Sequence, residues 1–354
     1  MPLKVRFLKA LHGDAIFITA IDEDGVSTIL IDGGPPSAFT PREVGDHRDG
    51  ALRKMLDELA GNGGQIDLLI MTHVDEDHIG GLIKGFEPPH HLRNLTRSVV
   101  FNSGQLIHEH FKLADVSQNV LRGNFSGSSQ TSIKQGITFE KLITDAGIWK
   151  RELFLQSMEH DLKNVKIRFL SPDEAGIKRL LRKWEKEQTS PFTSKRNTDY
   201  KQTYEQLLNN DAFIEDNSIH NNSSISCIIE FQSKIILLLG DAPPSKISDG
   251  LRSLNYSKSN PITADLVKLS HHGSKANTSP ELLDLINCDH YVVSTDGSRH
   301  GLPNKLTFAR IHHHNPNATI YFNYPEIIKT IYTQQEIEKL EGKLKGLNGD
   351  FCLG

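Results

Sequence analysis

Short apolar runs near both ends of the chain, separated by turn residues, constrain the fold more than any other feature. They are rich in β-branched residues, which indicates strands. Helical spacing of apolar residues predicts helices near 50–61 and 245–254, and others from Pro280 and Asn304. The strand runs read "KVRFLK", "DAIFITA", "VSTILID", "IDLLIMT", "SISCIIEF", "KIILLLGD", "ADLVKLS", "HYVVST" and "TIYFNY". This pattern predicts an α/β protein with two sheets packed face to face under outer helices.

The composition is that of a folded protein without a strongly basic character. The 354 residues are 37% hydrophobic and 24% charged, with a formal net charge of -4. This balance supplies a core and argues against a salt-driven nucleic-acid coat protein. A nuclease is not excluded, because bound metal ions would add positive charge. We predict one domain over residues 1–354, with a partly irregular insertion around 102–216.

Cysteine usage and hydropathy bear on the compartment. The three cysteines are far apart in sequence, which argues against a disulfide framework and fits a reducing compartment. There is no run of about 20 apolar residues that would predict a membrane span. The N-terminal stretch alternates like a strand and lacks the apolar core of a signal peptide. We therefore expect a cytoplasmic protein with no membrane partner.

The stretch "THVDEDHIGG", from Thr72 to Gly81, crowds acids and imidazoles directly after an apolar strand. Such groups would repel one another at the mouth of a buried strand unless a cation lay among them. A tight loop after the strand could turn His73, Asp75, Asp77 and His78 toward one point. A pair of first-row metal ions requires a mixed ligand set of this kind.

Two further apolar strands end in residues of the same type. "ILLLGDAP" places Asp241 after one strand, and "DLVKLSHHGS" places His271 and His272 after another. Sites in layered folds lie at strand ends, so the three clusters together predict a metal site. The alternative is a coincidence of polar loop ends.

These motifs resemble the metallo-β-lactamase fold superfamily, and more narrowly the ComEC-type metallohydrolases, the hydrolase domain of DNA-uptake proteins and their standalone relatives. "HGDAIFI" with "ILIDGG", "NNSSISCIIEF" and "STDGSRHGLP" also resemble that family's segments. The resemblance runs from residue 3 to about 310. It implies an αββα sandwich of the metallo-β-lactamase type with a two-metal site.

The resemblance also implies roles for individual residues. His73, Asp75, Asp77 and His78 would form the first cluster of ligands, and Asp241 would bridge the two ions. One or both of two adjacent histidines would complete the second site: His272 is the preferred ligand, and His271 either ligates or orients its neighbour.

The chain departs from the broad superfamily pattern at Asp75, where the second histidine of His-x-His-x-Asp-His is expected. ComEC-type members share this change. The added carboxylate makes the site harder and more negative, so the expected cofactors are two divalent ions, Zn²⁺ or Mn²⁺. A second departure is Leu302, which stands where a histidine is expected before proline. His300 could substitute for it.

Several other residues are candidates for the site. His220 lies where the superfamily places a further ligand, and its alternative is an exposed loop histidine. The ComEC-like pattern has asparagine at this place, and this chain has Asn221 and Asn222 there. Asp32 in "IDGG" is expected to brace the metal loop from behind, and Asp14 is expected to be a turn residue. The run His312–His314 is expected to be a solvated helix end rather than a metal tract.

The function implied by the resemblance is metal-dependent phosphodiester hydrolysis, with a nuclease as the leading form. Metal ions would lower the pKa of water, and Asp77 or Asp75 would orient the nucleophile or manage its proton. The partner would be nucleic acid or a small phosphodiester. One alternative is a hydrolase of cyclic nucleotides or phosphocholine esters. Another is a regulatory component of a multiprotein system, such as one of phage defence.

Overall fold

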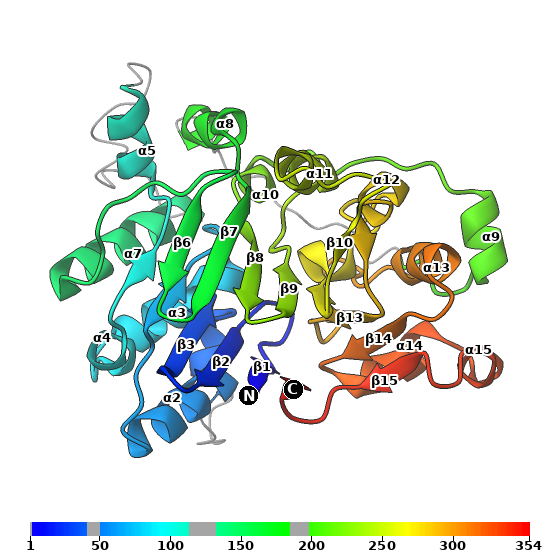
Figure 1. Cartoon of the computed structure of the whole chain (residues 1–354), viewed down its shortest axis with the longest axis horizontal. Coiled ribbons are helices and arrows are strands. Elements are labelled where there is room, and N and C mark those ends of the chain that lie inside the picture. The colour runs from blue at the N-terminus through cyan, green and yellow to red at the C-terminus, as the bar shows by residue number, and fades with distance from the viewer. Residues whose placement is uncertain (1, 41–49, 113–131, 185–197) are drawn as a thin grey trace.

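The computed structural model describes residues 2–40, 50–112, 132–184 and 198–354. Its strands form two large sheets that pack face to face (Figure 1). The six-stranded sheet has the order β16-β1-β2-β3-β4-β5. Its strands are β1 (Leu3–Phe7), β2 (Ile16–Asp22), β3 (Gly25–Ile31), β4 (Leu68–Ile70), β5 (Val99–Val100) and β16 (Phe351–Leu353). Because β1 pairs with β16, the two ends of the described chain lie side by side.

The eight-stranded sheet has the order β15-β14-β13-β11-β9-β8-β7-β6. Its strands are β6 (Glu159–Leu162), β7 (Val165–Ser171), β8 (Ser226–Phe231), β9 (Lys234–Leu238), β11 (Leu266–Lys268), β13 (His290–Val293), β14 (Thr319–Phe322) and β15 (Leu344–Gly346). A separate parallel pair joins β10 (Ile262–Thr263) to β12 (Ile286–Asn287). Strands β8 and β9 are antiparallel neighbours joined by a tight turn at Gln232 and Ser233.

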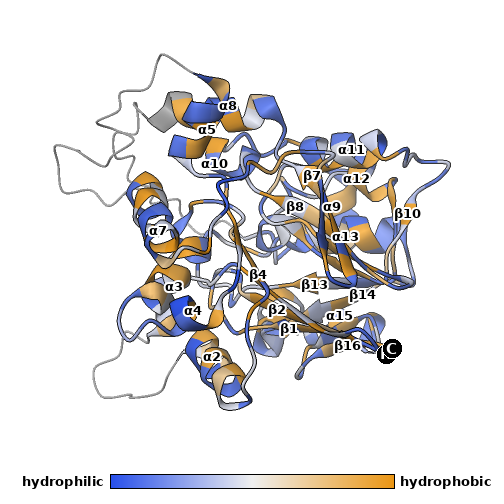
Figure 2. Ribbon diagram, turned by 60° about the vertical axis from the view of Figure 1, so that its left-hand side comes forward, coloured by the Kyte–Doolittle hydropathy of each residue, from blue (hydrophilic) through white to orange (hydrophobic). Residues whose placement is uncertain are grey.

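Helices cover the outer face of each sheet (Figure 2). On the six-stranded side are α1 (Pro36–Phe39), α2 (Ala51–Gly61), α3 (Glu76–Phe86), α4 (His91–Leu95) and α7 (Ser132–Ala146). Associated with the other sheet are α8 (Glu174–Trp184), α9 (Tyr204–Asn209), α10 (Ile219–Asn222), α11 (Pro244–Ser253), α12 (Pro280–Leu283) and α13 (Lys305–His314). The remaining helices are α5 (Gly104–Phe111), α14 (Ile328–Ile331), α15 (Gln334–Lys339) and the 3₁₀ turns η1 (Ser270–Gly273) and η2 (Pro325–Ile327).

The central strands are apolar on both faces because each face meets a different core. In β3, Ile29 and Ile31 pack between the sheets, whereas Leu30 packs under the helices. In β9, Ile236 and Leu238 face the first sheet, whereas Leu237 faces the outer helices. Side chains alternate along a strand, so continuous apolar runs require this double burial. The arrangement is an αββα sandwich, and the predicted fold class is confirmed.

Three details differ from expectation or add to it. Helix α3 begins at Glu76, so Asp77 and His78 lie in its first turn rather than in the predicted loop. The prediction that His312–His314 form a solvated helix end was wrong for His312. This residue is buried and contacts the hydroxyl of Tyr204 and the carbonyl of Ala318. None of the helices in the described part of the chain has the length and apolar character needed to span a bilayer.

The predicted insertion around 102–216 contains both peripheral helices and part of a sheet. Strands β6 and β7 belong to the eight-stranded sheet, and β7 pairs directly with β8. Residues 113–131 and 185–197 of this segment lie outside the described residues. The division into domains stays a prediction.

Candidate metal centre

The three predicted clusters converge because the strands that precede them end at one edge of the sandwich. Strand β4 leads into the loop 71–75 and then into α3. Strand β9 is followed by Gly240, at φ +51°, and then by Asp241. Strand β11, parallel to β9, leads into the turn that carries His271 and His272. Both histidines have left-handed backbones, with φ of 46° and 54°, which turn their rings back toward Asp241.

Asp241 is buried and surrounded by four imidazoles. Its Oδ1 lies 3.4 Å from Nε2 of His78. Its Oδ2 lies 3.9 Å from Nε2 of His73, and 3.8 Å from Nε2 of both His271 and His272. These separations are too long for direct hydrogen bonds, so the atoms share a small space without contacting one another.

Three of the histidines are held by their far nitrogen. Nδ1 of His78 lies 2.7 Å from Oδ2 of Asp32, and Nδ1 of His272 lies 3.0 Å from the backbone carbonyl of Ser294. Both partners only accept hydrogen bonds, so in each ring Nδ1 donates. In each neutral ring the lone pair is therefore on Nε2, as a metal ligand requires.

His73 is held in the same way through a relay. The hydroxyl of Thr72 lies 2.7 Å from Oδ2 of Asp32 and donates to it. The same hydroxyl lies 3.0 Å from Nδ1 of His73 and accepts its proton. The Thr72 amide also donates to Asp32, at 2.8 Å. Asp32 thus braces two histidines of the loop, which is the role predicted for it.

The inner ends of these side chains have no hydrogen-bond partner among the described residues. The atoms concerned are Nε2 of His73, Nε2 of His78, Nε2 of His272 and Oδ1 of Asp241, all buried. Buried polar atoms are almost always paired, because an unpaired one costs about 1–3 kcal/mol. Four such atoms around one point indicate that a cation belongs there.

Two more carboxylates face the same space. Oδ2 of Asp75 lies 3.6 Å from Nε2 of His73, and its Oδ1 lies 2.6 Å from Nδ1 of His220. Oδ2 of Asp77 lies 3.4 Å from Nε2 of His272. Predicted ligands from the loop, the helix and two other strand ends are therefore neighbours.

The electrostatics of the cluster are strongly coupled. Burial alone would raise the pKa of Asp241, but the surrounding histidines hold it well below its usual range. Burial alone would lower the pKa of His78, but Asp241 and Asp32 raise it well above the ordinary value. The pKa of His272 is raised to about 10 by Asp241 and Asp14, again against burial. Positive charge therefore stabilises the buried carboxylates of the site, and either protons on the histidines or a metal ion can supply it.

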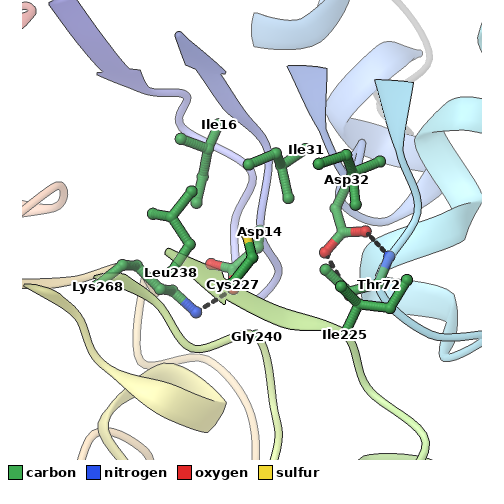
Figure 3. Close-up of a pocket in the computed structure, with 11 residues that line it drawn as sticks. Asp14, Ile16, Ile31, Asp32, Thr72, Ile225, Cys227, Leu238, Gly240 and Lys268 are labelled. Atoms are coloured by element: carbon green, nitrogen blue, oxygen red, sulfur yellow. Dashed lines mark hydrogen bonds and ion pairs between the residues drawn. The ribbon is translucent and has the colours of Figure 1, made fainter. Parts of the chain in front are cut away.

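Asp14 is a residue that the sequence argument undervalued. It is buried, and its Oδ2 forms an ion pair with the buried ammonium of Lys268 (Figure 3). Asp14, His78, Asp241 and His272 each offer a ligand atom within 4.8 Å of one another. Oδ1 of Asp14 also lies 3.6 Å from Nδ1 of His272, the nitrogen that donates to the carbonyl of Ser294. Asp14 is therefore either a further ligand or a neighbour that supports His272.

His271 is held by a different set of groups. Its Nδ1 lies 3.1 Å from Oδ1 of Asn277 and 3.3 Å from Oδ2 of Asp216. The Asn221 amide lies 3.3 Å from the same nitrogen. His271 is more exposed than His272 and has the geometry of either a ligand or an oriented neighbour, so both alternatives remain.

The remaining candidates fall at different distances from the centre. His220 is buried and contacts Asp75, as described above. Asn222 donates to the backbone of Ser218, and Asn221 lines the cavity instead, because successive residues of α10 point in different directions. His300 lines the cavity with a left-handed backbone.

A cavity of about 550 Å³ opens beside the cluster. Asp75, Asp77, Asp241 and His271 lie on its wall, so the candidate ligands are accessible to a small molecule. Asp216 and Lys275 also line it. The cluster is thus buried on the sheet side and open on the loop side.

Glycines allow the metal loop to pack closely against its neighbours. A Cβ at Gly13 would lie 1.9 Å from the carbonyl oxygen of Asp77. A Cβ at Gly81 would lie 2.0 Å from the carbonyl oxygen of Gly33. Contacts this short are forbidden, so only glycine lets α3 approach the loops after β1 and β3. Glycine is therefore required at Gly13 and Gly81, because a larger residue would displace the helix turn that carries Asp77 and His78.

Comparison with known proteins supplies no family assignment from sequence. No protein-family model matches the chain, and no curated protein matches it significantly. Similar solved structures include the metallo-β-lactamase fold protein YhfI from Bacillus subtilis, with 12% identity, full coverage of both chains and a TM-score of 0.41. Zn²⁺-bound PqqB from Methylobacterium extorquens has 10% identity, full coverage of both chains and a TM-score of 0.41.

A third similar structure is CmlA, a diiron β-hydroxylase from Streptomyces venezuelae. The identity is 11% and the TM-score 0.41, over 99% of this chain and 54% of CmlA. This chain thus spans about half the length of that protein. Similarity at this level supports no inference about activity, so the functional assignment rests on the residues of the site.

Four residues that position the site were missed or undervalued: Asp14, Asp216, Lys268 and Asn277. Lys268 had a usable signal, because a lysine inside the apolar run "DLVKLS" must find a buried partner. Asp216 and Asn277 had none. Asp216 contacts His271, and Asn277 contacts Asp216 and the backbone of Asp241; these segments are distant in sequence and meet only in the folded chain.

Proposed function

We propose that this protein is a metal-dependent hydrolase that cleaves phosphodiesters at a centre of two divalent ions. The observation that carries the proposal is the set of buried, unpartnered atoms around Asp241: three imidazole Nε2 atoms and one carboxylate oxygen. Each of these imidazoles is fixed by its other nitrogen, so the lone pairs are directed before any ion binds.

Two carboxylates each approach one histidine: Asp75 lies beside His73, and Asp77 lies beside His272. Asp241 approaches His73, His78 and His272, so it is the carboxylate that would hold both ions. The mixed nitrogen and oxygen donors suit Zn²⁺ or Mn²⁺.

Divalent ions at such a centre supply Lewis acidity and lower the pKa of water toward neutrality. The chain's own part is to hold the reacting groups in place. Asp75 and Asp77 line the cavity and can accept a proton from the attacking water. Burial would raise the pKa of Asp77, but His272 and His78 lower it to about 2, so Asp77 is ionised at neutral pH.

The substrate class follows from charge and from the motif resemblance. The ComEC-type motifs favour a nuclease, and we retain nucleic acid as the leading substrate. A small phosphodiester is the second candidate, because the cavity wall carries four carboxylates and a single lysine among the described lining residues. Proteins that follow a nucleic-acid backbone usually present several cations.

The test is a metal-reconstitution assay. Protein stripped with a chelator is reloaded with Zn²⁺ or Mn²⁺, its metal content is measured, and activity is screened. The substrates are single-stranded DNA, duplex DNA, RNA, cyclic nucleotides and bis-p-nitrophenyl phosphate. We expect up to two ions per chain and metal-dependent cleavage of at least one phosphodiester. A folded sample that takes up no metal at saturation would refute the proposal.

A further inference from the structure

The wall of the cavity beside the candidate metal centre carries an unbalanced arrangement of charge. Asp75, Asp77, Asp216 and Asp241 line it, and Lys275 is the sole lysine or arginine among the described lining residues. Four carboxylates would offset the charge of two divalent ions. An anionic substrate would then meet little net attraction from the metal-loaded centre unless another cation faced it.

The backbone of Lys275 is held by hydrogen bonds to two side chains. Its amide donates to Oδ1 of Asn304 at 2.9 Å. Its carbonyl accepts from the guanidinium of Arg310 at 2.5 Å. Arg310 is itself buried and pairs with both carboxylate oxygens of Asp211, at 2.6 and 2.7 Å. The Cα of Lys275 is therefore fixed at the cavity wall.

The side chain of Lys275, by contrast, is available. Lys275 is exposed, and none of the ion pairs found among the described residues involves it. It follows the His271–His272 pair by only three residues, so the same turn carries candidate ligands and a cation. The lysine side chain ends in an ammonium with three hydrogen-bond donors and no acceptor, which suits the oxygens of an anion.

We propose that Lys275 binds the non-bridging oxygens of an anionic, phosphate-containing substrate and so positions it against the metal centre. This inference rests on the proposed function and adds the residue that recognises the substrate's charge. A charged hydrogen bond at a partly open site is worth roughly 1.5 kcal/mol, or about tenfold in affinity. Ground-state binding of this kind changes KM more than kcat.

The test compares Lys275→Ala and Lys275→Arg with the wild type, each loaded with the same metal. The matched control is Lys54→Ala, which removes one exposed charge from α2, away from the cavity wall. Inorganic phosphate binding is measured by calorimetry, and the kinetics of bis-p-nitrophenyl phosphate cleavage are measured alongside. We expect about tenfold weaker phosphate binding and a KM raised about tenfold for Lys275→Ala. Its kcat and metal content should stay close to wild type, and Lys275→Arg should recover most of the loss.

The two proposals fail differently. If the wild type binds metal and phosphate but cleaves no phosphodiester, the proposed function fails, and phosphate binding by Lys275→Ala still decides the role of Lys275. Equal phosphate binding by Lys275→Ala and wild type would overturn that role, as would an equal loss in Lys54→Ala. Absence of phosphate binding by the metal-loaded wild type would also overturn it.

Discussion

Oδ2 of Asp32 lies 2.7 Å from Nδ1 of His78 and 2.7 Å from the hydroxyl of Thr72, so one carboxylate oxygen braces two imidazoles of the metal centre. Asp32 has a left-handed backbone with φ of 56°, directly after β3. Its side chain therefore turns back across the end of the neighbouring strand β4. The Asp32 amide also donates a hydrogen bond to the carbonyl of Ile70 in that strand. His73, through Thr72, and His78 are thus oriented by Asp32, which lies 40 positions or more away in sequence.

We predict that Asp32→Asn weakens metal binding without unfolding the protein. Asparagine tolerates the same left-handed backbone but loses the charge that holds Nδ1 of His78. Loss of such a supporting partner typically weakens metal affinity by about 10–100-fold. Competitive titration with a chromophoric chelator would measure it. Asp22→Asn, at the last residue of β2, is the matched control, and an equal loss in both variants would contradict this role.

We predict that Asp241→Ala abolishes activity with little loss of secondary structure. Asp241 approaches four imidazoles, so its removal should disrupt the whole set of candidate ligands. Losing one placed electrostatic group typically costs about 10²–10³ in rate, and losing the metal pair should cost more. Metal content, circular dichroism and turnover should be measured together. Asp249→Ala on α11 is the control, and near wild-type turnover in Asp241→Ala would show that Asp241 is not the bridge.

We predict that Mn²⁺ supports phosphodiester cleavage at least as well as Zn²⁺. The Asp75 carboxylate adds a hard, negatively charged donor where the broad superfamily pattern has an imidazole. Zn²⁺ should still bind more tightly, so the prediction concerns turnover rather than affinity. Asp75→His should shift the preference toward Zn²⁺. Activity only with Zn²⁺, or an unchanged preference in Asp75→His, would show that this account of the loop is wrong.

We predict that Lys268→Met destabilises the protein by about 3–5 kcal/mol. The substitution leaves Asp14 as an unpaired charge between the sheets, and breaking a buried ion pair typically costs this much. Adding Asp14→Asn should recover part of the loss. Denaturant unfolding would measure both. Lys258→Met breaks an exposed pair with Asp284 and should cost at most about 1 kcal/mol. A similar cost for the two lysines would contradict the prediction.

The same pair should give a stability that depends on pH. Burial would raise the pKa of Asp14, but Lys268 lowers it below the usual range. A carboxyl with a lowered folded pKa contributes stability above its unfolded pKa of about 3.9, and this is lost as the pH falls through the folded value. The difference in the free energy of unfolding between the wild type and Asp14→Asn should therefore decrease as the pH falls. A constant difference between pH 7 and pH 3 would refute it.

The layered fold could be predicted from the sequence because its signal is local and repeated. Runs such as "IDLLIM" and "KIILLL" are apolar at every position, and only a strand covered on both faces buries all of them. Residues that directly follow such strands were also predictable as site residues, since strand ends of layered folds meet at one edge. This rule predicted four of the site residues, and the structure brings them together: His73, His78, Asp241 and His272.

The tertiary structure alone decided which atoms face the centre and which residues hold them. Nothing local to the sequence places Asp216 beside His271, or Asp14 between Lys268 and His272, because each of these contacts joins segments far apart in the chain. Likewise, Asn221 rather than Asn222 reaches the cavity because α10 fixes the direction of each side chain. Strand patterns depend on burial, which the order of apolar residues encodes. Ligand orientation depends on hydrogen bonds between distant loops, and those exist only once both sheets have packed.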